Sequence, residues 1–263
     1  TVERFVYGFR AVRAMATNTF RASVRSRVFI ALLIFCAGIM LSSLLLGALS
    51  LHNELRVTTD VTLFASTIFS AAITIYVTID LLHTEIDRHT IHTILSKPVR
   101  RWQFVLGKFL GILALMAAIV ALLFGFAATL VALQGGTITL ELGYAFALIY
   151  LQIVILTAAA MLFASYSSPL LSGLFAAAVF VLGHLHEQLE TLASTFEGAW
   201  LRRLADVLEH VVPDLASLNL TVELVRDIPV PSDYLLTAVW YASSYAAIAL
   251  FGAMIVFSNR DIE

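Results

Sequence analysis

The side chains best suited to chemistry gather in one polar stretch, residues 83–101, with long apolar runs on both sides. Three histidines, His83, His89 and His92, lie there beside acids that could join them around a metal ion. A helical zinc pair uses histidines four residues apart, and no two of these three have that spacing. We therefore predict no metal site and look for another role for the stretch.

The stretch has the pattern of a short amphipathic helix that ends before Pro98. At about 100° per residue, its apolar side is formed by Ile86, Thr90, Ile91, Ile94 and Leu95. The opposite side is formed by Glu85, Arg88, His89, His92 and Ser96. Such a helix is too short to cross a membrane, and its two-sided character favours docking of a soluble partner. The alternative is an interfacial turn without a partner.

A second pattern consists of hydroxyl groups that recur every fourth residue within the apolar run 61–82. They belong to Thr62, Ser66, Ser70, Thr74 and Thr78. Hydroxyls inside a membrane helix can bond back to the carbonyl four residues earlier, and small side chains allow close helix packing. The functional alternative is a mildly polar wall of a translocation path at a subunit interface, lined by Ser66, Ser70, Thr74 and Thr78.

Motifs for ATP hydrolysis and for common enzymes are missing from the sequence. Gly107-Lys108-Phe109 lacks both the first glycine of a phosphate-binding loop and the hydroxyl residue that would meet magnesium. Neither the His-Glu-x-x-His nor the Gly-x-Ser-x-Gly pattern occurs. Cys36 is the only cysteine, so an internal disulfide is impossible. We expect a chain that is not itself an enzyme and holds no cofactor.

The composition identifies the elements that position these groups as membrane helices. Apolar residues make up 60% of the chain and charged residues 13%, whereas charged residues supply about a quarter of a soluble domain. We predict an all-α, polytopic membrane protein with a single domain, residues 1–263. The predicted transmembrane spans are 28–51, 61–82, 104–133, 143–163, 170–186 and 234–257. The fifth is short for ~30 Å of hydrocarbon, so it must tilt little, extend, or lead into a re-entrant segment.

Basic residues orient these spans. Lys and Arg concentrate in residues 1–27 and 88–108, whereas the opposite side carries only Arg56, Arg202, Arg203 and Arg226. By the positive-inside rule, both termini and the segment 83–103 are expected in the cytoplasm. Nothing in the pattern suggests a nucleic-acid partner.

Two further segments are amphipathic. Residues 1–27 carry an apolar stripe at helical spacing and are predicted to form an interfacial helix on the inner surface of the membrane. The alternative is a cytoplasmic helix packed on another subunit. Residues 187–233 contain an amphipathic stretch that ends at Pro213, which predicts an outer helix lying on the membrane or dipping into it.

Four short motifs, in order along nearly the whole chain, resemble the permease subunits of the ABC-2-type family. They are Asn18-Thr-Phe-Arg21 with Arg25-Ser-Arg27; Glu85-Ile-Asp-x-x-Thr90-Ile with Leu95-Ser-Lys-Pro-Val-x-Arg101 and Leu106-Gly-Lys108; Val212-Pro-Asp-Leu-x-x-Leu-Asn219; and Phe257-x-x-Arg-Asp261. The resemblance implies a six-helix type V exporter half with an N-terminal connecting helix. It also implies a coupling helix after span two and short re-entrant helices before span six.

The resemblance also implies partners and a mechanism. Members are subunits of ATP-binding-cassette exporters in the bacterial inner membrane, in which two permease chains, as a homodimer or heterodimer, join two ATPase subunits. ATP and magnesium bind to the ATPase, which would push the docked helix. Residues Glu85, Ile86, Arg88, His89, Thr90, Ile91, Ile94 and Leu95 are the candidates for ATPase docking. Arg88 and Arg101 would support that contact or meet anionic lipid. The alternative is a mechanotransmitting or regulatory subunit that moves no substrate.

Overall fold

The computed structural model describes residues 15–20, 23, 26–50, 53–87, 101–186, 211–219 and 233–259, with the side chains of 85–87, 101, 258 and 259 left out. All regular secondary structure in these ranges is helical, which confirms the predicted all-α class. The helices are α2 (Arg27–Leu49), α3 (Glu54–Asp87), α5 (Arg101–Leu133), α6 (Leu140–Tyr166), α7 (Pro169–His184) and α11 (Tyr234–Asn259).

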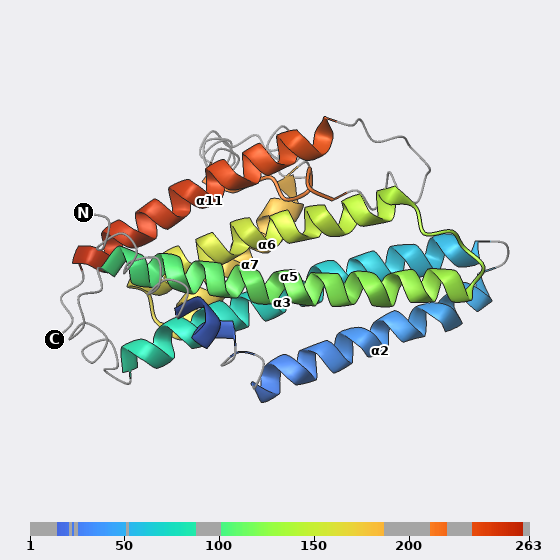
Figure 1. Ribbon diagram of the computed structural model, residues 1–263, viewed down its shortest axis with the longest axis horizontal. Coiled ribbons are helices and arrows are strands. Elements are labelled where there is room, and N and C mark those ends of the chain that lie inside the picture. The colour runs from blue at the N-terminus through green and yellow to red at the C-terminus, as the bar shows by residue number, and fades with distance from the viewer. Residues whose placement is uncertain are drawn as a thin grey trace, which may run out of the picture.

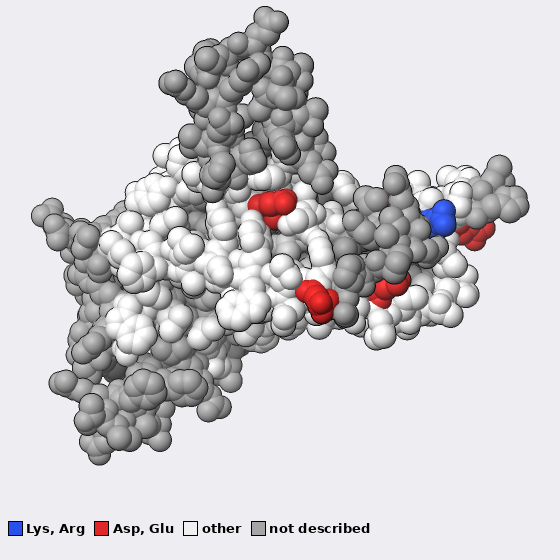
Figure 2. Space-filling view, turned by 90° about the horizontal axis from the view of Figure 1, so that it is seen from above, with Lys and Arg blue, Asp and Glu red and all other residues white. Residues whose placement is uncertain are grey.

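Five of these helices, α2, α3, α5, α6 and α11, are long and apolar enough to cross a membrane. On the face seen in Figure 2, most of the described surface is free of charged residues. The predicted fifth span, 170–186, corresponds to α7, which has only 16 residues. At ~1.5 Å per residue it covers ~24 Å, less than the ~30 Å of hydrocarbon. The six-span count is therefore not confirmed by the described helices.

The helices lie roughly alongside one another, with α2 and α11 at opposite edges of the bundle (Figure 1). In the apolar stretch of α6, 67% of the residues are buried, against 22% in α2 and 28% in α11. The sequence of α6 fits this central position, because it is apolar on all sides. We therefore place α6 at the centre of the subunit and α2 and α11 at its periphery.

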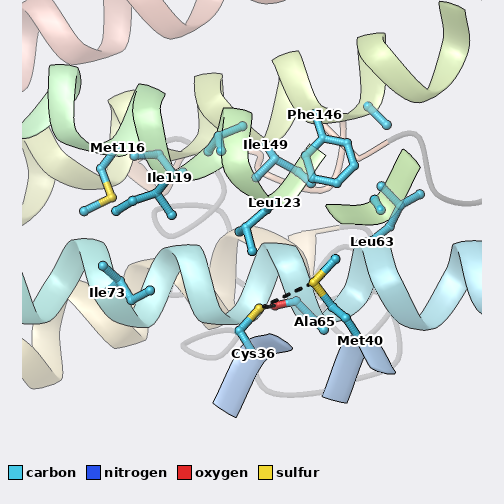
Figure 3. Packing of buried hydrophobic residues seen from close by; sticks show 14 of the residues in the cluster. Cys36, Met40, Leu63, Ala65, Ile73, Met116, Ile119, Leu123, Phe146 and Ile149 are labelled. Atoms are coloured by element: carbon cyan, nitrogen blue, oxygen red, sulfur yellow. Dashed lines mark hydrogen bonds between the residues drawn. The ribbon is translucent and has the colours of Figure 1, made fainter. Parts of the chain in front are cut away.

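The larger part of the core is formed where α2, α3, α5 and α6 meet. Figure 3 shows side chains from all four helices interleaving there, among them Cys36, Ile73, Leu123 and Phe146. Cys36 is fully buried, and its sulfur lies 3.9 Å from both the Met40 sulfur and the Ala65 carbonyl oxygen. The lone cysteine thus behaves as a small apolar core residue.

At one end of this core, glycines let three chain segments approach closely. A methyl group built at Gly47 would lie 2.9 Å from the Thr58 hydroxyl oxygen and 3.0 Å from Nε2 of Gln134. One built at Gly136, in the α5–α6 turn, would lie 2.7 Å from side-chain atoms of both Leu55 and Val131. We call Gly47, Thr58, Gln134 and Gly136 the glycine junction. It joins the α2–α3 hairpin to the α5–α6 turn.

Candidate functional site

The predicted docking segment, 83–103, is bracketed by the two longest helices. Helix α3 has 34 residues and runs on to Asp87, while α5 has 33 and begins at Arg101. Residues 83–87 therefore continue α3 and do not start a separate helix. The reason is that no helix breaker occurs before Pro98.

Only part of the predicted docking surface can be placed. Glu85 and Ile86 lie in the last turn of α3, without described side chains. The other predicted docking residues lie outside the described residues; they are Arg88, His89, Thr90, Ile91, Ile94 and Leu95. The docking role therefore stays a prediction.

His83, just before this surface, ties the end of α3 to the turn between α6 and α7. Its side chain is buried, with 9% exposed. Nδ1 lies 3.2 Å from the Ile79 carbonyl oxygen in the same helix, and Nε2 lies 3.1 Å from the Ser167 carbonyl oxygen. From its spacing to other histidines, His83 suggested only a metal ligand. In the structure, its ring contacts carbonyl oxygens of α3 and of the α6–α7 turn.

The N-terminal segment packs against α5 at the same end. Residues 15–20 are helical, with Thr19 fully buried. A methyl group built at Gly111 of α5 would lie 2.8 Å from Cβ of Thr19 and 2.9 Å from the Ala16 backbone. Glycine at this position therefore lets the two backbones touch. The rest of the predicted interfacial helix, 1–27, is described only at residues 23, 26 and 27.

The hydroxyl stripe of α3 faces the interior of the subunit. Ser66, Ser70, Thr74 and Thr78 are each at most 1% exposed. Ser66 donates to the Thr62 carbonyl at 2.7 Å, and Thr74 donates to the Ser70 carbonyl at 2.7 Å. These are the back-bonds of the packing interpretation. A path along this stripe would require α3 to separate from its neighbours, because the Thr74 hydroxyl also lies 3.3 Å from the Met116 sulfur of α5.

A further polar arrangement involves the segment 211–219, which is mostly irregular. Gln152, midway along α6 and 4% exposed, donates from Nε2 to the carbonyl oxygens of Leu215 and Leu218, both at 3.0 Å. Leu215 and Leu218 are themselves buried. Irregular backbone is tolerated inside a membrane only where protein or water satisfies its polar groups. Gln152 does so here.

Two other helices complete this attachment. At the end of α7, the Gly183 carbonyl accepts from the Leu215 amide at 3.0 Å and from the Ala216 amide at 3.1 Å. From α11, the Tyr241 hydroxyl accepts from the Asp214 amide at 2.8 Å, and the Tyr245 hydroxyl donates to the Val211 carbonyl. We call Gln152, Gly183, Tyr241 and Tyr245 the segment cradle.

The sequence indicated residues 212–219 as a motif, but it did not predict the segment cradle that holds them. A lone glutamine within an apolar run was the available signal, since polar residues in membrane spans usually have a specific task. The tyrosines gave none, because aromatic residues are common near the ends of spans. Among the described residues, no cluster of three or more histidines, cysteines or acids could hold a metal ion.

Comparison with known protein families gives a match for the first two thirds of the chain. The family model described as ABC-2 family transporter protein matches residues 13–185, from the N-terminal segment through α7. A search of curated proteins gave no match. Since the matched region covers more than half of the sequence, and the described helices include five of membrane-spanning length, the chain belongs to the ABC-2 family of transporter proteins, as a membrane permease.

Proposed function

We propose that this chain is the membrane-spanning permease subunit of an ATP-binding-cassette exporter in the bacterial inner membrane. A separate ATPase subunit, which binds ATP and magnesium, docks on it. The observation that carries the proposal is that α3 ends at Asp87 and α5 begins at Arg101 at the same end of the bundle (Figure 1). At ~1.5 Å per residue each is ~50 Å long, well over the ~30 Å hydrocarbon core. Both can therefore reach beyond the membrane at the docking end.

The proposed topology has six membrane segments, with α7 as the fifth and both termini in the cytoplasm. The distribution of Lys and Arg supports this orientation. With two permease chains and two ATPase subunits, the assembly would couple ATP-driven closure of the ATPase pair to movement of α3 and α5. Lipids would cover the remaining apolar surface.

Co-purification tests the ATPase partner. The tagged chain, extracted from its native membrane, should bring down an ATP-binding subunit, and the complex should hydrolyse ATP. A chain that is isolated alone under mild extraction, from several detergents, would contradict the proposal.

Charge reversal tests the docking surface. Glu85→Lys should greatly reduce recovery of the ATPase, because it replaces an acid at the proposed contact by a base. Glu54→Lys is the matched control, since Glu54 is exposed at the opposite end of the same helix. Equal recovery with both variants would remove Glu85 from the docking site.

Two variants test the translocation path. Ser70→Ala and Thr74→Val remove the hydroxyls with little change of volume. If Ser66, Ser70, Thr74 and Thr78 line a path that opens during transport, the double variant should change the substrate-stimulated ATPase rate while its thermal midpoint stays close to that of the wild type. A changed midpoint with unchanged stimulation would assign the hydroxyls to packing.

Burial of these hydroxyls favours a second candidate, a subunit that transmits force to a partner on the outer side and moves no substrate. The two candidates differ in what stimulates ATP hydrolysis by the reconstituted complex. A soluble outer protein should be sufficient for force transmission, whereas a transported molecule should be required for export.

A further inference from the structure

Helix α7 is attached at both of its ends to elements that the proposed mechanism needs to connect. Near its start, His83 of α3 reaches the Ser167 carbonyl oxygen. Its last turn holds segment 211–219 through the Gly183 carbonyl. We propose that α7 transmits movement of the docking end of α3 to segment 211–219, with His83 as the positioning residue of that link. The inference rests on the proposed function, because the movement originates at the docked ATPase.

The hydrogen bond at the near attachment comes from one side chain, His83. Both ring nitrogens of His83 face carbonyl oxygens, at 3.2 Å in Ile79 and 3.1 Å in Ser167. Ile79 belongs to α3 itself, where the helix supplies its own N–H donors. The contact that reaches another element is therefore the one to Ser167, and it requires a hydrogen on Nε2. His83 lies two residues before Glu85, so a displacement of the α3 end acts directly on this bond.

Helix α7 has the length and the regular structure needed to transmit a displacement from one end to the other. It starts at Pro169, a favourable first helical residue, and the Ser172 amide donates to the Ser168 carbonyl at 2.9 Å. Its 16 residues form a rod of ~24 Å. Along the rod, Gly173 lies against Ile79 of α3. The close contact keeps the start of α7 beside α3.

At its far end, α7 is packed tightly against segment 211–219. A methyl group built at Gly183 would lie 2.7 Å from the Pro213 carbonyl oxygen and 2.8 Å from Cγ of Leu215. Two amides of the segment bond to the Gly183 carbonyl, and the next contacts lead to Gln152 in the middle of α6. A shift of α7 along its axis must therefore move the segment or break these bonds.

Helix α5 is the other long element at the docking end, yet it does not lead to the segment. Its far end is the turn at Gly135 and Gly136, within the glycine junction. The described contacts of segment 211–219 come from α6, α7 and α11. Among the described helices that touch the segment, α7 is the one that begins directly after the turn bonded by His83 and that lies against Ile79 of α3 through Gly173.

The first arm of the test uses the chain alone. A Leu215→Cys reporter, in a Cys36→Ser background, is labelled with N-ethylmaleimide; Leu215 is fully buried, so the rate reports opening of the segment. His83→Leu should raise the labelling rate about tenfold by loosening the attachment of α7. His83→Gln, which retains an N–H donor, should restore most of the protection. Thr84→Val is the control and should label like the parent. Because replacing Leu215 by cysteine leaves a cavity, the measurement is repeated with an Ala216→Cys reporter, which creates none.

The second arm uses the complex with its ATPase. ATP should change the labelling rate of the reporter in the parent and in Thr84→Val, and the change should disappear in His83→Leu although ATP is still hydrolysed. The link through α7 would be overturned if ATP changed the labelling rate equally in His83→Leu and in the parent. It would also be overturned if the labelling rate of the parent did not change while ATP is hydrolysed. Equal labelling of His83→Leu and Thr84→Val in the first arm would overturn it without any ATPase. Absence of the ATPase would instead refute the proposed function.

Discussion

At the glycine junction, chain segments meet because side chains are missing, whereas segment 211–219 is held by side chains that reach out to it. Gly47 and Gly136 admit neighbouring atoms where a Cβ would collide. In the segment cradle, an amide and two tyrosine hydroxyls bond to backbone groups of the segment. The first arrangement rests mainly on close packing, with the Thr58 hydroxyl donating to the Ser43 carbonyl at 3.2 Å, and is suited to a fixed contact. The second consists of separate bonds of ~0.5–1.5 kcal/mol each and is suited to a contact that changes.

The largest effect on this contrast is expected from Gln152→Leu. The change removes the side-chain donor of two carbonyls. That of Leu215 still accepts from the Leu218 amide at 3.2 Å, whereas that of Leu218 loses its described donor, at ~1–3 kcal/mol for a buried group. Segment 211–219 should then exchange its amide hydrogens faster, as measured by mass spectrometry. Thr157→Val, which removes a buried hydroxyl that bonds within α6 at 2.7 Å, should leave the segment protected. Unchanged exchange in Gln152→Leu would show that the apolar contacts alone hold the segment.

Gly183→Ala should have the next largest effect. The added methyl group meets a backbone oxygen, the Pro213 carbonyl, which cannot rotate away, and overpacking of this kind costs ~1–3 kcal/mol. The thermal unfolding midpoint in detergent should fall. Gly143→Ala is the control in α6, because nothing lies within 4 Å of its new methyl group. A fall of the same size in both would mean that the cradle is not tightly packed.

Gly47→Ala tests the glycine junction and should destabilise less than Gly183→Ala. The closest atoms are the ends of the Thr58 and Gln134 side chains, which can move, while the nearest backbone atom, the Glu54 oxygen, is 3.1 Å away. Gly38→Ala in the same helix faces open space and should gain up to ~1 kcal/mol of helix propensity. The thermal unfolding midpoints of Gly47→Ala and Gly38→Ala measure the difference. If Gly47→Ala is as stable as the wild type, the side chains at the glycine junction can move to accommodate the methyl group.

Tyr241→Phe should give the smallest change. It removes one acceptor, for the Asp214 amide, at a cost of ~0.5–1.5 kcal/mol. Hydrogen exchange should rise at Asp214 and less at the rest of the segment. Tyr144→Phe, at an exposed position of α6, is the control, and an equal response would assign the effect to the aromatic substitution itself.

How far the sequence predicts this fold depends on what each signal measures. Hydropathy indicates which residues can lie in hydrocarbon, and five of the predicted spans overlap helices that are long and apolar enough to cross a membrane. It does not report where a helix ends, and α3 extends beyond 61–82 at both ends through polar residues such as Arg56 and Thr84. The short fifth apolar run was predicted as a span; it corresponds to α7, which is shorter than the five helices long enough to cross a membrane.

The cradle could not be predicted, because it depends on contacts between distant parts of the chain. The acceptors of Gln152 lie more than sixty residues away, and a single amide has no periodicity. The same limit applies to His83, whose spacing suggested only metal binding until the position of Ser167 was known. The predicted docking residues from Arg88 to Leu95 stay a prediction.

The shortness of α7 has a consequence for the surrounding lipid. Leu170, Leu174, Phe175 and Val181 are exposed on this helix in the single chain, so lipid that meets this face finds ~24 Å of apolar length, against ~30 Å in an average bilayer. Acyl chains there must compress, at a modest cost for each ångström of mismatch. The protein should therefore favour thin regions of the bilayer over thick ones. A change in bilayer thickness should also shift the resting position of α7.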